Sequence, residues 1–342
     1  MSYRVLNSIS VKNLSGKEFV KDKSSLLVVL VDKSAKKNKL LIHMDKVTKG
    51  GLFKSINSFV KSKAKSLNLQ SPDGVSSKEV LLMKTPDKSN TYLWLDLFKS
   101  ISKTANSLGK QDISVMFACK CPDGKDESWL TEVCCRQIEA SAYIFGSSKN
   151  KTVVKPSLKK ASIIASSVTS SALKKLKTSA KVGFAVGEAM NAAKHLGDMP
   201  ANLCTPRIIE RKVKALKKPF PKLKISTFNE KDLAKLKMGS FLSVGRGSDE
   251  PSRMMTIEHK GGKAGEKPIV LVGKGITFDT GGISLKPSPA MDEMKWDMCG
   301  AASVFGVMIA LARLNAKVNV VGLLACAENM PCLLYTSPSP RD

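Results

Sequence analysis

Short apolar runs alternate with longer helix-like patterns along the first half of the chain. Runs of four or more aliphatic or β-branched residues favour buried strands, and apolar positions three or four apart favour amphipathic helices. The predicted strands are 26–31, 40–42, 80–83, 92–97 and 113–118, and the predicted helices are 52–67, 100–108 and 127–145. This alternation predicts an α/β domain with a largely parallel sheet.

The alternation restarts after a long helix pattern over residues 171–196, which follows a predicted strand at 162–166. Thr205 and Pro206 are typical of a helix start. Further strands are predicted at 223–228, 254–259, 269–272 and 318–325, with a helix over 298–314. We therefore predict an N-terminal α/β domain and linker over 1–165, a second α/β domain over 166–331, and a polar interdomain connection within 147–160.

Composition and charge narrow the class of protein. The chain has 342 residues, of which 42% are hydrophobic and 25% charged, as in globular proteins. Its net charge of +27 lies almost entirely in residues 1–250, because residues 251–342 carry 10 basic and 8 acidic side chains. A lysine-rich solvated surface explains this charge, and nucleic-acid binding is the alternative. Eight cysteines without a CxxC pair, and an N-terminus without a signal peptide or membrane segment, predict a reduced cytoplasmic protein.

Charged residues gather in the stretch 273–297, which follows the apolar run 268–272 and precedes the helix pattern at 298–314. In α/β sheets, ligands bind where loops leave the carboxyl ends of strands. The stretch contains a double glycine that permits close backbone approach. Its candidate functional side chains are Lys274, Asp279, Lys286 and Asp297.

Each of these side chains has an ordinary explanation by itself, such as a helix cap at Asp297 or a solvated lysine. Four charged groups at one strand end, however, are costly unless they satisfy one another. A divalent metal would resolve this, with Asp279 and Asp297 as oxygen ligands, one deprotonated lysine as a nitrogen ligand, and the other lysine stabilising an oxyanion. Other patterns are absent, because the sequence has neither HExxH nor GxSxG.

The segment VGKGITFDTGGISLKPSPAMDEMKWDMCGAA, residues 272–302, resembles the signature of the leucine aminopeptidase family, in particular its bacterial aminopeptidase A branch. The similarity continues through 202–206, 241–248 and 326–331, and it spans roughly residues 185–331. It implies two α/β domains, the second being a mixed-sheet metallopeptidase domain, and assembly into a homo-hexamer.

The resemblance also implies a chemistry. Family members release N-terminal residues, preferentially leucine-like ones, from peptides by activating water with two divalent ions, such as Mn or Zn, and a bound carbonate. The family's metal ligands correspond to Lys274, Asp279 and Asp297, its catalytic lysine to Lys286, and a residue lining the substrate side-chain pocket to Met294.

The sequence departs from the family pattern after Pro331. The family continues with a glycine-rich loop and NTDAEGR, which supply further metal ligands and the carbonate-binding arginine, whereas this chain reads CLLYTSPSPRD. We therefore expect residues 332–342 to be an unrelated or artefactual tail, the catalytic domain to be partial, and these 342 residues to be inactive. A nucleic-acid-binding protein and a noncatalytic scaffold are the alternative functions.

Overall fold

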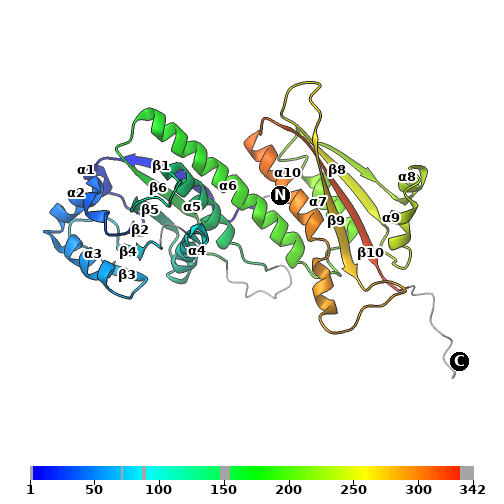
Figure 1. The fold of residues 1–342 in the computed structure, drawn as a ribbon, viewed down its shortest axis with the longest axis horizontal. Helices are drawn as coiled ribbons and strands as arrows, with labels where there is room; N and C mark the ends of the chain where they lie inside the picture. Colours follow the sequence, from blue (N-terminus) through cyan, green and yellow to red (C-terminus); the bar gives the residue numbers. More distant parts are fainter. Residues whose placement is uncertain (1–2, 71, 87–89, 147–154, 332–342) are drawn as a thin grey trace. The chain divides into compact units, whose positions relative to one another are not determined.

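The computed structural model describes residues 3–70, 72–86, 90–146 and 155–331 (Figure 1). They divide into two compact units. The N-terminal unit contains Arg4–Ile144 and residues 155–187, and the C-terminal unit contains the described residues from Glu188 onward with Tyr3 and Phe145. The domain limits inferred from the sequence stay predictions, and the tail 332–342 and most of the proposed connection lie outside the described residues.

The N-terminal unit has a six-stranded sheet in the order β1-β6-β5-β2-β4-β3. All neighbouring strands are parallel except β3 and β4. This confirms the predicted α/β class with a largely parallel sheet. The strands are β1 (Ser8–Leu14), β2 (Leu26–Val31), β3 (Ser66–Gln70), β4 (Glu79–Lys84), β5 (Asp112–Ala118) and β6 (Lys160–Ser166).

Helices cover both faces of this sheet. They are α1 (Gly16–Phe19), η1 (Ala35–Lys37), α2 (Lys39–Val47), α3 (Gly51–Lys61), α4 (Thr91–Ser107), α5 (Glu127–Ser141) and α6 (Ser170–Asp198), the last of which continues into the C-terminal unit. Strand β2 is entirely buried, and its residues alternate between two cores because strand side chains alternate between faces. Leu26, Val28 and Leu30 pack with α4 and α5, whereas Leu27, Val29 and Val31 pack with α2 and α3.

Two predicted strands in this unit are wrong. Residues 40–42 lie in α2 and residues 92–97 in α4. In each case an asparagine caps the helix: Asn38 Oδ1 accepts hydrogen bonds from the amides of Leu40 and Leu41, and Asn90 Oδ1 accepts one from Tyr92. The predicted helix 52–67 ends at Lys61, where α3 stops before β3 begins.

The C-terminal unit has a four-stranded sheet in the order β7-β8-β10-β9. Strands β9 and β10 are parallel and the other pairs antiparallel, which confirms a mixed sheet. The strands are β7 (Lys224–Phe228), β8 (Arg253–Lys260), β9 (Ile269–Asp279) and β10 (Asn319–Asn329). The remaining helices are α7 (Pro206–Ala215), α8 (Glu230–Lys235), α9 (Gly239–Val244), η2 (Met291–Trp296) and α10 (Cys299–Leu314).

Strand β9 differs from its prediction in length and burial. It continues to Asp279 rather than ending at Val272, and it is one of the two edge strands of the four-stranded sheet in the described part of the chain. Ile269, Val270 and Val272 are exposed, so this is not the buried strand that its apolar sequence predicts.

Helix α10 packs closely on β9 through small residues. A Cβ at Gly273 would lie 2.6 Å from the Cα of Ala301, and one at Gly300 would lie 2.9 Å from the amide nitrogen of Lys274. The segment Met291–Leu314 is long and apolar enough to cross a membrane by length and composition alone. Six α10 side chains instead pack in the core of this unit: Ala301, Ala302, Val304, Phe305, Met308 and Ile309.

Candidate metal centre

The charged side chains selected from the sequence meet at the carboxyl ends of the parallel strands β9 and β10. Asp279 ends β9, and its register partner Asn329 ends β10. Lys274 lies within β9 rather than in the loop after it, which corrects the sequence-based placement. The pairing of β9 with β10 therefore sets the backbone positions of Lys274 and Asp279, whatever conformation the following loop adopts.

A tight turn after β9 brings Lys286 back to Asp279. The amide and the hydroxyl of Thr280 both donate to the carbonyl of Asn329 at 2.9 Å, and the amide of Lys286 donates to the carbonyl of Thr280 at 2.9 Å. Gly281 and Gly282 have φ of 91° and 68°, in the region that favours glycine. A Cβ at Gly281 would lie 2.3 Å from the Ser284 carbonyl oxygen, so the turn requires this glycine.

Two lysine–carboxylate pairs result. Lys286 Nζ lies 2.5 Å from Asp279 Oδ2, and Lys274 Nζ lies 2.7 Å from Asp297 Oδ2. The Sδ atom of Met294, in η2, lies 3.3 Å from Lys286 Nζ. The structure therefore brings all five predicted site residues into one cluster.

Hydrogen bonds hold Asp279 ionised. Burial by itself raises the pKa of this carboxyl, but the contacts around it lower the pKa to about 2. Those contacts come from Lys286, the Gly281 amide at 3.0 Å, the Asn329 side-chain amide at 2.7 Å, and the Asp297 carboxyl. Sequence reasoning missed Asn329, which lies beyond the predicted strand 318–325. Its place in the segment 326–331, which also resembles the family, was the available signal.

Asp297 is not the N-cap of α10, because Met298 occupies that position. It is instead the C-cap residue of η2. Its Oδ2 atom is buried and, despite the close approach of Lys274, has no hydrogen bond with suitable geometry to any described residue. A buried carboxylate oxygen in this state is under-satisfied.

The donor set fits a divalent cation. Asp279 and Asp297 are close enough to interact, and two neighbouring carboxylates favour a cation between them. The incompletely bonded Oδ2 of Asp297 is available as a ligand, and Lys274 Nζ lies beside it. Among the described residues, no group of three His, Cys, Asp or Glu side chains comes together, so a third protein ligand here would be of another type.

Comparison with known proteins identifies relatives of this chain. Residues 191–338 match the sequence profile of the "Cytosol aminopeptidase family, catalytic domain". A probable cytosol aminopeptidase of Aromatoleum aromaticum is 42% identical over 245 residues, which cover 72% of this chain and 49% of that protein. The chain thus spans about half the length of this relative.

Solved structures share the fold. A variant of tomato leucine aminopeptidase aligns with a TM-score of 0.71 at 22% identity, covering 94% of this chain and 63% of its own. The bottromycin maturation enzyme BotP in complex with Mn aligns with a TM-score of 0.70 at 23% identity, covering 90% of this chain and 60% of its own. The fold described above, with both of its sheets, is therefore that of known leucine aminopeptidases.

Proposed function

Residues 191–338 belong to the catalytic domain of the cytosol aminopeptidase family, and from this membership we propose that the chain is part of a metal-dependent aminopeptidase. Its substrates would be peptides, from which it releases N-terminal residues, preferentially leucine-like ones. The observation that carries this proposal is the cluster of Asp279, Asp297, Lys274 and Lys286 at the end of β9. The related curated proteins are named cytosol aminopeptidases, which supports a hydrolase and a cytoplasmic location.

Lys274, Asp279 and Asp297 would hold the metal, which we propose to be Mn or Zn. The BotP structure, which contains Mn, supports this choice. A divalent ion bound here would polarise the scissile carbonyl and lower the pKa of water. A lysine can serve as a ligand only without its proton, so Lys274 would lose its ion pair with Asp297 when the metal binds.

Lys286 would act as the catalytic lysine. Its ammonium lies 2.5 Å from Asp279, so it stands next to the metal position and can donate a hydrogen bond to a developing oxyanion. The turn through Gly281 and Gly282 fixes this position through the backbone. Met294 contacts the same ammonium and would present an apolar wall to the substrate's first side chain.

Two ions would need more ligands than the described residues provide, because only two carboxylates meet here. We therefore propose that this chain by itself binds a divalent ion without hydrolysing peptides. The second ion, the carbonate, a hexamer and contact with nucleic acid stay predictions.

Calorimetric titration of the chain with Mn²⁺ tests the metal site. Asp279→Asn and Asp297→Asn should each weaken binding by about 10-fold or more, because each removes a charged ligand. Asp292→Asn is the matched control, since Asp292 is exposed in the neighbouring η2. Equal affinities in all four proteins would refute the site, and this is the outcome expected of the nucleic-acid-binding and scaffold alternatives.

A chimera tests the aminopeptidase activity. Residues 1–331 would be joined to the corresponding C-terminal part of the Aromatoleum aromaticum relative and assayed with leucine 4-nitroanilide and Mn²⁺. We expect hydrolysis that disappears in Lys286→Ala and is absent from the 342-residue chain. Turnover by the chain alone would refute its proposed inactivity, and activity of the chimera that survives Lys286→Ala would refute the role of Lys286.

A further inference from the structure

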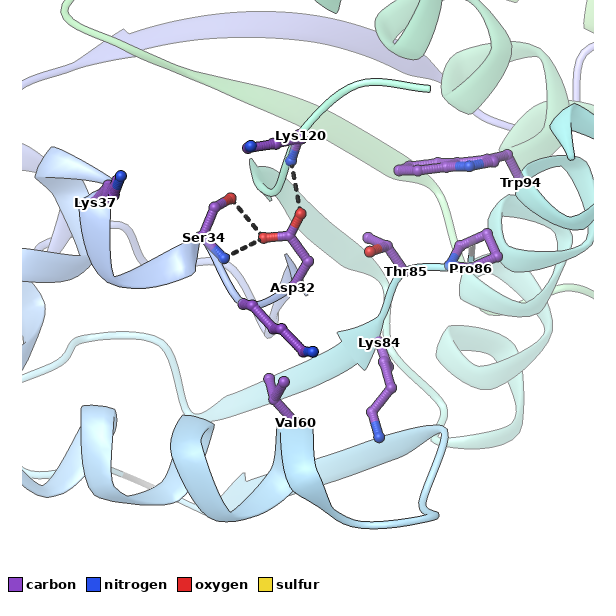
Figure 2. A pocket seen from close by; sticks show the side chains of 10 residues that line it. Asp32, Ser34, Lys37, Val60, Lys84, Thr85, Pro86, Trp94 and Lys120 are labelled. Carbon is purple, nitrogen blue, oxygen red and sulfur yellow. Dashed lines mark hydrogen bonds between the residues drawn. The ribbon is translucent and has the colours of Figure 1, made fainter. Parts of the chain in front are cut away.

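A cavity lies in the N-terminal unit, lined by residues that take no part in the metal centre. Its volume is about 700 Å³, and Figure 2 shows the side chains around it. Most of its lining follows directly on three strands of the sheet, since β2 ends at Val31, β4 at Lys84 and β5 at Ala118. The lining residues are Asp32, Lys33, Ser34, Lys37, Val60, Lys84, Thr85, Pro86, Trp94 and Lys120.

The sheet topology explains why a cavity forms here. The chain leaves β2 toward β4 on one side, whereas it leaves β5 toward β6 on the other side. The connections therefore diverge between the carboxyl ends of β2 and β5, which is the point where open α/β sheets bind ligands. Lys33, Lys37 and Lys120 lie on these diverging segments.

The cavity carries a surplus of positive charge. Lys84 donates to the Ser62 carbonyl at 2.5 Å and lies over the Phe59 ring. Lys33, Lys37 and Lys120, in contrast, form no ion pair with a described residue. All three side chains are exposed, so an anion in the cavity could reach their ammonium groups.

Asp32, the one carboxylate among the described residues of the lining, is engaged by the protein itself. It accepts hydrogen bonds from the Ser34 amide and hydroxyl at 2.6 and 2.5 Å, and from the Lys120 amide at 3.0 Å (Figure 2). These bonds join the segment after β2 to the segment after β5. Asp32 therefore shapes the cavity rather than neutralising its lysines through ion pairs.

Trp94 adds an unused donor to the wall. Its side chain is fully buried, and its ring extends from α4 toward the side of the cavity that holds Lys120 (Figure 2). The indole Nε1–H has no hydrogen-bond partner among the residues that the structure describes. Leaving a buried donor unpaired costs about 1–3 kcal/mol, which a ligand acceptor would recover.

We propose that this cavity binds a small phosphate-bearing molecule of about nucleotide size. Its volume falls in the range of roughly 300–1,000 Å³ typical of small-molecule sites, which is larger than a single phosphate requires. Lysine ammonium groups bind phosphate as point charges, and the partly exposed Val60 and Pro86 offer apolar surface to an organic moiety. This inference rests on no part of the aminopeptidase proposal, because it uses residues of the N-terminal unit only.

Calorimetric titration of the whole chain tests the proposal, with ADP and inorganic pyrophosphate as probes. The variant Lys33→Gln/Lys120→Gln should weaken binding of both probes at least 10-fold. Lys174→Gln/Lys177→Gln is the matched control, because it removes two lysines from α6, which also line a shallow surface pocket, without touching this cavity. Trp94→Phe keeps an aromatic ring but loses the N–H group, and it should weaken the binding of ADP several-fold.

The outcomes separate specific binding from attraction to a basic surface. Saturable one-to-one binding that falls in the cavity variant and persists in the control supports the site. Tighter binding of ADP than of pyrophosphate assigns it to organic phosphates, and equal binding assigns it to the phosphate groups alone. The proposal would be overturned if neither probe bound, or if the two double-lysine variants lost the same amount of binding affinity. Both outcomes can be read even if Trp94→Phe does not fold.

Discussion

The two units each gather polar side chains at the carboxyl ends of parallel strands, but the two groups differ in charge. At the ends of β9 and β10, carboxylates and lysines pair with each other at 2.5 and 2.7 Å. After β2 and β5, three lysines have no ion-pair partner among the described residues, and the one carboxylate of the described lining bonds to backbone and serine groups. One arrangement suits a cation and the other an anion.

This difference separates two contributions to a site. Sheet topology determines where a site forms, because strand ends and diverging connections create the space in both units. Side-chain charge determines which ligand the space suits, since unpaired charges at a strand end favour a counter-ion. The backbone also contributes differently: the metal centre depends on a glycine turn, whereas the cavity depends on hydrogen bonds to Asp32.

The largest expected effect comes from adding one methyl group to the glycine turn. Gly281→Ala would place a Cβ 2.3 Å from the Ser284 carbonyl oxygen at a φ of 91°, so the backbone must shift and Lys286 with it. We expect a loss of about 2–5 kcal/mol in the free energy of unfolding and loss of Mn²⁺ binding. Urea denaturation and calorimetry measure both quantities.

Gly265→Ala is the control for this variant. Gly265 has a φ of 79° but no atom within 4 Å of an added Cβ, so it tests backbone strain without a clash. Its cost should be about 1–2 kcal/mol with Mn²⁺ affinity unchanged. If Gly281→Ala lowers the free energy of unfolding by no more than Gly265→Ala does, the glycine turn does not determine the geometry of the metal centre.

The grouping of the charged side chains that we propose as the metal centre could be predicted from the sequence because these residues are close together along the chain. Lys274 and Asp279 lie in one strand, Lys286 in the turn after it, and Asp297 directly after the short helix η2. The cavity could not be predicted, since its lysines lie at or after the ends of three different strands, and only the order β5-β2-β4 brings those ends together. A sequence pattern identifies residues that are close along the chain, but it does not show which strands become neighbours in a sheet.

The two incorrect strand predictions, at 40–42 and 92–97, also arise from reading short local patterns. An apolar run such as 40–42 is too short to distinguish a strand from one buried turn of a helix. The caps Asn38 and Asn90 were the deciding signals, and they precede the runs rather than lying within them. Strand β1 was missed although its burial alternates, because its sequence mixes serine and lysine with apolar residues.

Removal of the carboxylate at Asp32 should have an intermediate effect. Asp32→Ala leaves the amides of Ser34 and Lys120 without their acceptor, which should cost about 1–3 kcal/mol of stability. Thermal unfolding measures this cost, and the exposed Asp292→Ala is the control, expected to change stability by no more than about 0.5 kcal/mol. An unchanged melting temperature in Asp32→Ala would show that Asp32 does not hold the two segments together.

Substitution of a carboxylate at the metal centre should change the stability of the metal-free chain very little. Asp297→Asn removes a charge from a buried oxygen that has no hydrogen bond, and its partner Lys274 is largely exposed and can be solvated. We expect a change within about 1 kcal/mol, in either direction, together with weakened Mn²⁺ binding. A large loss of stability would assign Asp297 to the fold rather than to the metal.

The last expected effect concerns the acid sensitivity that Asp279 gives to the folded chain. Because contacts in the folded state lower the pKa of Asp279 to about 2, its carboxylate contributes stability above its unfolded pKa of about 4, and this contribution disappears as the pH falls toward 2. In the presence of a chelator, the gap in unfolding free energy between the unsubstituted chain and Asp279→Asn should therefore narrow between pH 5 and pH 2. Urea denaturation across this range measures the gap. A gap that stays constant would mean that Asp279 gains nothing from Lys286 and Asn329, and the contrast with the unpaired lysines of the N-terminal cavity would then fail.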